Sequence, residues 1–133
     1  MELGLNKKVV LITGAASGIG AVAARAFAAE GADLALIDVN GPGLVELVNE
    51  LHRGSLVVSL AVADLATRDG VERGIEEALA AHDGRIDVLV NNVGVCVPRS
   101  FDQTTDDDWL STWNLNFMSY QRASAQVLPR MRV

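Results

Sequence analysis

A glycine-rich stretch near the start of the chain has the composition of a phosphate-binding loop. It reads TGAASGIG, from Thr13 to Gly20, and follows a short aliphatic run. Backbone N–H groups at the start of a helix attract the pyrophosphate of a dinucleotide. We expect Gly14, Gly18 and Gly20 to form this site, because a side chain at Gly14 or Gly20 would hold the phosphates off. The alternative is a tight turn that uses glycine only for its backbone freedom.

An acidic residue, Asp38, stands where the other end of such a ligand would lie. It ends the second aliphatic run, and a carboxylate there accepts hydrogen bonds from both adenosine ribose hydroxyls and repels a 2′-phosphate. No lysine or arginine stands within the glycine-rich stretch or directly after Asp38. The expected cofactor is therefore NAD, with NADP less favoured. A helix-capping or solvated loop aspartate is the alternative role.

Alternating strands and helices must position these residues. Short apolar runs predict strands over residues 9–13, 34–38, 56–62 and 86–93. Apolar residues at helical spacing predict a helix after each strand. The residues expected to begin helices are Asn40, Thr67 and either Thr104 or Thr105, and those expected at the end of helices are Gly31, Gly84 and Pro129. Strand and helix thus alternate four times with short loops. This pattern predicts one doubly wound α/β unit with a parallel sheet.

Composition excludes several classes of function. The chain has 133 residues and a net charge of −6, whereas nucleic acids and anionic membrane surfaces bind basic patches. Neither is therefore expected as a partner. The single cysteine, Cys96, excludes an internal disulfide, and no residues stand at metal-ligand spacing. We see no signal-peptide pattern and no apolar run that would span a bilayer, so the expected location is cytoplasmic.

The sequence resembles the short-chain dehydrogenase/reductase family over essentially its whole length. TGAASGIG is similar to the family's cofactor loop, which adds Ser17 and Ile19 to the expected cofactor-binding residues. VADL is similar to the segment after the third strand. This likeness implies that Asp64 hydrogen-bonds the adenine amino group and that Leu65 lines the adenine pocket. The resemblance implies a Rossmann-like NAD(P)-binding domain over residues 1–133, partial because it is truncated after about four βα units.

Two later motifs extend the resemblance. NNVG, at residues 91–94, is similar to the family's Asn-Asn-Ala-Gly and implies that Asn92, Val93 and Gly94 border the cofactor. Val93 stands where the family has alanine, so the adenosine pocket is expected to be narrower. DWLSTWNLNFMSYQRASAQVLPRM resembles the family's long interface helix. Its spacing implies that the catalytic-helix asparagine is Asn116 rather than Asn114.

The family's other catalytic groups have no counterpart in these 133 residues. The family's proton relay uses a serine, a tyrosine and a lysine four residues after the tyrosine. Tyr120 is the only tyrosine here, and Ser124 stands four residues after it. We therefore expect an NAD-dependent oxidoreductase of alcohols or ketones by descent, inactive as this chain alone. The alternatives are a non-catalytic dinucleotide-binding module and a dimerisation partner of a full-length relative.

The fourth strand and the last helix predict association with another chain. In the family's strand order, 3-2-1-4-5-6-7, truncation leaves strand four as an open apolar edge, which favours pairing. The last helix carries more apolar residues than one face buries, and in the family it packs in a dimer interface. The expected partner is a second copy or another chain. These apolar residues are Trp109, Trp113, Leu115, Phe117, Met118, Val127 and Leu128.

Three remaining side chains have ordinary expected roles. His52 and His82 stand near helix ends, where a solvated imidazole or one that interacts with the helix dipole is more common than a catalytic one. Cys96 is expected to be a buried or half-buried thiol. The segment VCVPRSFDQTT would line the substrate pocket of a complete enzyme, but its residues do not indicate which substrate that enzyme binds.

Overall fold

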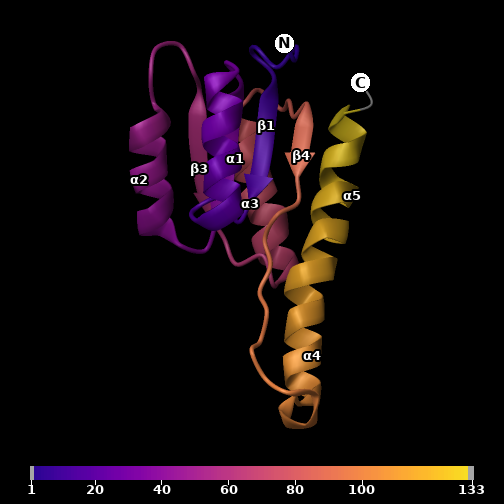
Figure 1. Ribbon diagram of the computed structural model, residues 1–133. Coiled ribbons are helices and arrows are strands. Elements are labelled where there is room, and N and C mark those ends of the chain that lie inside the picture. The colour runs from indigo at the N-terminus through magenta and orange to yellow at the C-terminus, as the bar shows by residue number, and fades with distance from the viewer. Residues whose placement is uncertain (1, 132–133) are drawn as a thin grey trace.

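The computed structural model describes residues 2–131 and places a parallel sheet between two layers of helices (Figure 1). The strands are β1 Val9–Thr13, β2 Asp33–Asp38, β3 Val58–Val62 and β4 Val88–Val90, in the order β3-β2-β1-β4. The helices are α1 Gly18–Ala29, α2 Gly41–Leu51, α3 Arg68–Ala81, α4 Asp106–Trp113 and α5 Ser119–Met131. A 3-10 turn, η1 Phe101–Gln103, precedes α4, and a π-helical segment, η2 Asn114–Met118, joins α4 to α5. This arrangement confirms the expected Rossmann-like α/β fold.

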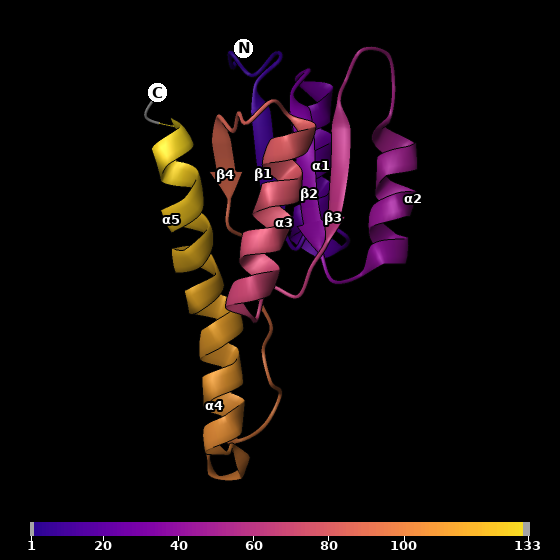
Figure 2. The same ribbon diagram turned by 180° about the vertical axis from the view of Figure 1, so that it is seen from behind.

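The core consists of two apolar layers, one on each face of the sheet. Helices α1 and α2 cover one face, and α3 and α5 cover the other (Figures 1 and 2). Successive side chains of a strand point to opposite faces, so Val10 and Ile12 join the α1 layer while Leu11 joins the α3 layer. These three side chains are fully buried because β1 has a strand on each side. The continuous apolar run of β1 follows from this central position.

The strands agree with the expected ranges except at their ends. β1 spans the expected residues, β2 begins one residue early at Asp33, and β3 begins two residues late at Val58. The fourth strand is the clearest difference, because β4 covers only three residues of the expected run 86–93. It pairs with β1 alone, and beyond Val90 the chain turns to pass the end of β1.

Side chains expected to cap helices do so. The side chain of Asn40 accepts a hydrogen bond from Gly43 N–H at α2, and that of Thr67 accepts one from Gly70 N–H at α3. Of the two candidates for the last helix, Thr105 is the cap, and it forms a capping box with Asp108. Such caps satisfy backbone donors that lack partners in the first turn of a helix.

Small residues, rather than the larger apolar ones, form the buried face of α1. Gly20, Ala21 and Ala24 are buried, whereas Ile19 is 80% exposed and Val22 is 63% exposed. The apolar spacing of this segment therefore predicts the helix but not its inner face. Small side chains allow the start of α1 to lie close to the glycine-rich loop.

The last helical stretch extends past the sheet. Figure 2 shows α4 projecting beyond the carboxyl ends of the strands, with α5 packed beside α3. Val127 is buried against α3, but Trp109, Trp113 and Phe117 each remain more than half exposed. Trp113 and Phe117 stack with their ring centroids 4.3 Å apart. In the single chain this helical stretch therefore exposes large apolar side chains, which confirms that it carries more of them than one face buries.

Candidate functional site

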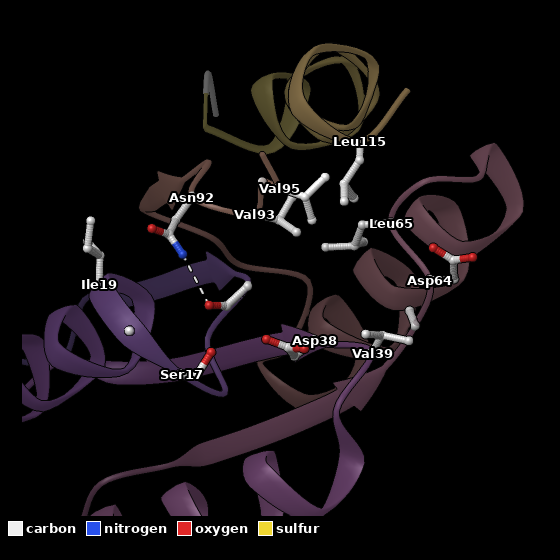
Figure 3. Close-up of a pocket in the computed structure, with 14 residues that line it drawn as sticks. Ser17, Ile19, Asp38, Val39, Asp64, Leu65, Asn92, Val93, Val95 and Leu115 are labelled. Atoms are coloured by element: carbon white, nitrogen blue, oxygen red, sulfur yellow. Dashed lines mark hydrogen bonds between the residues drawn. The ribbon is translucent and has the colours of Figure 1, made fainter. Parts of the chain in front are cut away.

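A cavity of about 400 Å³ opens at the carboxyl ends of the parallel strands. This is the place where ligands bind in open α/β sheets, and the volume is within the usual range for small-molecule sites. Figure 3 shows its walls, formed by the start of α1, the end of β2, the segment after β3 and the segment after β4. The lining residues are Gly14, Ser17, Gly18, Ile19, Asp38, Val39, Ala63, Asp64, Leu65, Asn92, Val93, Gly94, Val95 and Leu115.

Every residue expected to bind the cofactor lines this cavity, except Gly20. Residues far apart in the chain thus meet at one end of the sheet, as the parallel topology requires. Sequence reasoning missed Val39, Ala63, Val95 and Leu115. The first three directly adjoin expected residues, so they could have been found by including chain neighbours. Leu115 reaches the cavity from η2. It adjoins the expected residue Asn116, but we expected it only among the apolar residues of the last helix.

The glycines are needed for close contacts within the protein. A Cβ built at Gly20 would lie 2.2 Å from Gly14 O, and one at Gly14 would lie 2.8 Å from Val93 Cα. We expected side chains at these positions to displace phosphate, but they would collide with the protein backbone first. Gly18 differs, because a Cβ there meets nothing within 4 Å, while its φ of +54° favours glycine.

Asp38 both organises the loop and faces the cavity. Its Oδ2 accepts a hydrogen bond from Ala16 N–H at 2.9 Å, and its Oδ1 accepts one from Asn40 N–H at 2.9 Å. The loop role that we kept as an alternative is therefore present. It does not use up the carboxylate, because each oxygen has a further lone pair. Asp38 thus retains acceptor capacity at the end of β2.

The segment after β4 is held against the glycine-rich loop by Thr13 and Asn92. The Asn92 Nδ2 group donates to Thr13 O at 3.0 Å and to Gly14 O at 3.1 Å. In return, Thr13 Oγ1 accepts from Asn92 N–H at 3.0 Å and from Val93 N–H at 3.2 Å. These bonds join two walls of the cavity, so its shape is largely determined before any ligand binds.

Asn116 holds a neighbouring wall rather than lining the cavity itself. Its Oδ1 accepts from Val95 N–H at 2.8 Å, and its Nδ2 donates to Val95 O at 2.6 Å. Asn116 lies in η2, a π-helical segment of the kind that often occurs at functional sites. It also borders a second cavity of about 430 Å³, between residues 95–104 and α4. Val95 lines both cavities, so Asn116 positions the wall between them, and its catalytic role stays a prediction.

The charges around the first cavity are negative. Asp38 and Asp64 line it, and no lysine or arginine does so within residues 2–131. The Asp64 Oδ1 atom accepts from Ala66 N–H at 2.9 Å, while the residue remains exposed. The lining therefore offers hydrogen-bond acceptors to hydroxyl or amino groups. It offers no cationic side chain to an additional phosphate.

Two expectations about polar side chains are wrong, namely the solvated alternative for His82 and the buried or half-buried thiol at Cys96. The helix-end position expected of His82 is present, because it directly follows α3. His82 is only 6% exposed, and its Nε2 lies 3.1 Å from Leu34 O and 2.9 Å from Ser59 Oγ. Because Leu34 O is an acceptor, Nε2 carries the proton. Burial lowers the pKa of His82, although the bond to Leu34 partly opposes this. Cys96 is exposed, because it lies on the irregular segment after β4.

No cluster of histidine, cysteine and carboxylate side chains in the described part of the chain is arranged to bind a metal ion. No helix within residues 2–131 is long and apolar enough to span a membrane.

The parallel sheet and the glycine-lined cavity define a Rossmann-like α/β protein of the dinucleotide-binding class. A family model described as short chain dehydrogenase matches residues 8–132, and the chain belongs to this family of oxidoreductases. It is 40% identical to the oxidoreductase YvrD of Bacillus subtilis, covering 98% of this chain and 49% of YvrD. It is 41% identical to D-threitol dehydrogenase of Mycolicibacterium smegmatis, covering 84% of this chain and 43% of that enzyme. The chain spans about half the length of the curated relatives it matches.

Solved structures agree with this assignment. L-sorbose reductase from Gluconobacter frateurii, complexed with NADPH and L-sorbose, matches with a TM-score of 0.92 and 33% identity, covering 99% of this chain and 50% of the reductase. A short-chain dehydrogenase/reductase from Burkholderia phymatum, in complex with NAD, matches with a TM-score of 0.88 and 29% identity, covering 98% of this chain and 46% of that chain. Relatives with this fold therefore bind either NADPH or NAD.

Proposed function

We propose that this chain forms the adenosine and pyrophosphate half of the cofactor site of an NAD-dependent oxidoreductase of alcohols or ketones. The observation that carries the proposal is the lining of the first cavity, in which Asp38 stands beside the glycine-rich loop. Within residues 2–131, no lysine or arginine lines this cavity. NAD fits this lining better than NADP, because a 2′-phosphate would lie beside a carboxylate without a compensating charge.

The residues present suit each part of a dinucleotide. Backbone N–H groups around Gly18 and Ile19, at the start of α1, would bind the pyrophosphate. Asp38 would accept hydrogen bonds from the ribose hydroxyls. Asp64 would accept one from the adenine amino group, with Leu65 against the ring. Bound NAD supplies the hydride acceptor of the reaction, and the chain's own residues bind and orient it.

Proton transfer needs groups outside these 133 residues. Tyr120 is half-buried in α5 and has no lysine four residues later. A phenol without a cationic partner is a poor general base near neutral pH. We therefore propose that the 133-residue chain binds NADH without turnover. Asn116 would serve by holding Val95 at the wall that the two cavities share.

The location and the assembly of the chain are also proposals. We propose that the protein is cytoplasmic and that it self-associates or binds a partner chain through the exposed aromatic side chains of α4 and η2. Trp109, Trp113 and Phe117 form this surface, which we call the aromatic face. An exposed apolar patch of this kind is typical of protein interfaces.

A parallel fluorescence titration with NADH and NADPH tests the proposed cofactor site. Trp109 and Trp113 act as energy-transfer donors, and we expect saturable binding that is tighter for NADH than for NADPH. Asp38→Ala should weaken NADH binding by about tenfold, the size of one lost charge-assisted hydrogen bond. Asp107→Ala, which removes a carboxylate from the exposed first turn of α4, is the control. Equal binding by the Asp38 variant and the unchanged chain would contradict the proposal.

A second candidate function is a binding module without any catalytic role. The lining of the first cavity favours it, because the glycine-rich loop and Asp38 suit binding and need no proton relay. This function predicts the same affinity for NADH in the titration. It predicts no dehydrogenase activity when a segment bearing serine, tyrosine and lysine is added. A dimerisation partner of a full-length relative would instead form heterodimers that are indifferent to NAD.

A further inference from the structure

The second cavity, of about 430 Å³, lies beside the proposed cofactor site. It is formed where the segment after β4 runs alongside α4 and η2 (Figures 1 and 2). Val95 lines both cavities, so molecules bound in the two would be neighbours. A reaction between two bound molecules requires such closeness. The volume of the second cavity is also within the usual range for small-molecule sites.

Two aromatic rings form an apolar wall of the second cavity. Phe101 of η1 is 83% exposed and Trp109 of α4 is 58% exposed, and both line the cavity. Their ring centroids are 6.3 Å apart and their planes are inclined by 68°, so the rings do not stack on each other. Ring faces therefore remain open to a ligand, and Val95 and Val97 add aliphatic surface.

Several polar side chains around this cavity are already bonded within the protein. Trp109 Nε1 donates to Thr104 Oγ1 at 3.2 Å, and Thr104 Oγ1 donates to Phe101 O at 2.7 Å. Asn116 uses both polar ends of its side-chain amide on Val95. These bonds hold the aromatic wall in place before a ligand binds, and they leave few partners for the hydroxyl groups of a ligand.

The two charges of the lining neutralise each other. Arg99 Nη1 donates to Asp108 Oδ2 at 2.7 Å, and Thr105 N–H donates to the same oxygen at 2.9 Å. The hydrogen bond from Thr105, together with the nearby guanidinium of Arg99, lowers the pKa of Asp108, so the pair stays ionised. Within residues 2–131, no other charged side chain lines this cavity. The lining therefore offers no unpaired charge to an ionic ligand.

We propose that the second cavity binds the substrate, and that this substrate is an uncharged alcohol or ketone with a ring and a single polar group. The ring would lie against Phe101 and Trp109. Thr112 also lines the cavity and takes part in none of the bonds above, so its hydroxyl would bond the polar group of the ligand. A polyol would leave several hydroxyls without partners, which costs free energy for each. This inference deepens the proposed function and rests on it for the role of the ligand as substrate.

A nuclear magnetic resonance titration with para-fluoroacetophenone, an uncharged aryl ketone, tests the proposal on the 133-residue chain. We expect a saturable shift of the fluorine signal and of the Trp109 indole N–H signal, which the Trp113→Phe variant identifies. Trp113 is not among the residues that line the cavity, so its indole signal is the internal control. The chain concentration is kept constant, so that self-association contributes equally to every point. Sorbitol, a polyol, and para-fluorobenzoate, an anion, should bind at least tenfold more weakly.

Two variants separate the polar contact from the apolar one. Thr112→Val removes the hydroxyl and keeps the size of the side chain, so it should weaken ketone binding by about threefold to tenfold. It should leave the binding of para-fluoroethylbenzene, which has a similar shape without the oxygen, unchanged. Phe101→Ala should weaken both probes by about fivefold, because it removes one of the two rings. Leu110→Ala is the matched control, since Leu110 is 60% exposed on α4 and is not among the lining residues.

The outcomes test the site and the class of ligand separately. Tighter binding of sorbitol or para-fluorobenzoate than of the ketone would overturn the proposed class. Equal shifts of both indole signals, or equal effects of Phe101→Ala and Leu110→Ala, would overturn the site. The titration is made with and without saturating NADH, which distinguishes this inference from the cofactor proposal. Ketone binding without NADH binding would support the ligand class while the cofactor proposal fails, and NADH binding without ketone binding would overturn this inference alone.

Discussion

At the scale of single residues, the site depends on groups that hold the protein's own backbone together. Asp38 binds two backbone N–H groups, and Asn92 binds two backbone oxygens. Asn116 likewise binds both polar groups of one residue, Val95. Substitutions here are therefore expected to change ligand binding through the shape of the cavity as well as through direct contact.

The glycines of the loop provide a graded test. Gly20→Ala should abolish measurable NADH binding, because its Cβ would overlap Gly14 O and force the loop to move. Gly18→Ala should cost about 1 kcal/mol of stability through its positive φ, without such a collision. Gly54→Ala is the matched control, because it has a φ of +62° in open space but lies outside the cavity. Chemical unfolding of the three variants measures the cost of backbone strain, and NADH titration measures the effect on the site. Normal NADH binding by Gly20→Ala would refute the role of the close contact between Gly20 and Gly14.

Asn116 should matter for binding as well as for any chemistry. Asn116→Leu removes both hydrogen bonds to Val95 and leaves two backbone groups of an exposed residue to water. We expect NADH affinity to fall by about threefold to tenfold, since each such bond contributes about 0.5–1.5 kcal/mol. Asn114→Leu is the control on the same helical turn. Equal affinities for both variants would show that the bonds to Val95 do not shape the site.

At the scale of elements, His82 connects the end of α3 to two strands. It is the residue after the last turn of α3, and its Nε2 reaches Leu34 of β2 and Ser59 of β3. The carboxylates of Asp33 and Asp83 and the guanidinium of Arg85 are the charged groups nearest to it. This connection places a neutral imidazole at the amino-terminal end of the sheet, away from the cavity.

His82 makes the stability of the fold depend on pH. Its pKa in the folded chain lies below the ordinary value of 6.5, because burial disfavours the charged form. As the pH falls below about 6.5, the unfolded chain takes up a proton before the folded chain does. The free energy of unfolding therefore decreases with falling pH, and the contribution is complete only above that value.

His82→Gln should make the free energy of unfolding less dependent on pH between pH 7 and 5. This range lies on the order of one pH unit above the range in which carboxylates titrate. Urea unfolding at several pH values measures this dependence. His52→Gln, which replaces an exposed imidazole with the same side chain, is the matched control. Asp87 has a lowered pKa as well, because hydrogen bonds from Val9 and Arg85 outweigh its partial burial, and it acts in the same direction at lower pH.

The order of the elements was predictable from sequence, whereas their ends and buried faces were only partly so. Apolar runs and capping residues such as Asn40 and Thr67 are local signals, and the structure confirms them. The short β4 depends on which strands pair, and this is decided by tertiary contacts. The exposed Ile19 and the buried His82 likewise depend on neighbours far away in the chain. Sequence motifs therefore located the cavity lining, but the collision of Gly20 with Gly14 required coordinates.

At the scale of the whole molecule, one end of the structure is well packed and the other presents apolar side chains. The sheet and its two helical layers bury β1 and β2 almost completely. The aromatic face lies on the helix that projects from this body, away from the strands (Figure 2). A net charge of −6 keeps molecules apart at long range, so association through this face should strengthen as salt screens the charge.

Replacing two side chains of the aromatic face should shift the chain towards the monomer. We expect the Trp113→Gln, Phe117→Gln double variant to weaken self-association by at least tenfold, because aromatic side chains dominate interface energies. Sedimentation velocity over a range of chain concentrations measures this change. The Val45→Gln, Val57→Gln variant replaces residues of similar exposure elsewhere and should associate normally. A monomeric unchanged chain at all concentrations would contradict the proposed interface.

The sheet topology also has a consequence for the order of folding. The registers Val10–Leu34 and Leu34–Val58 each join residues 24 apart, whereas Val10–Val88 joins residues 78 apart. Closing the longer loop costs about 1 kcal/mol more chain entropy. We therefore expect the first three strands to assemble as a unit and β4 to join afterwards. The last pairing event then brings Asn92 to Thr13, so the first cavity acquires its final wall only when β4 has joined the sheet.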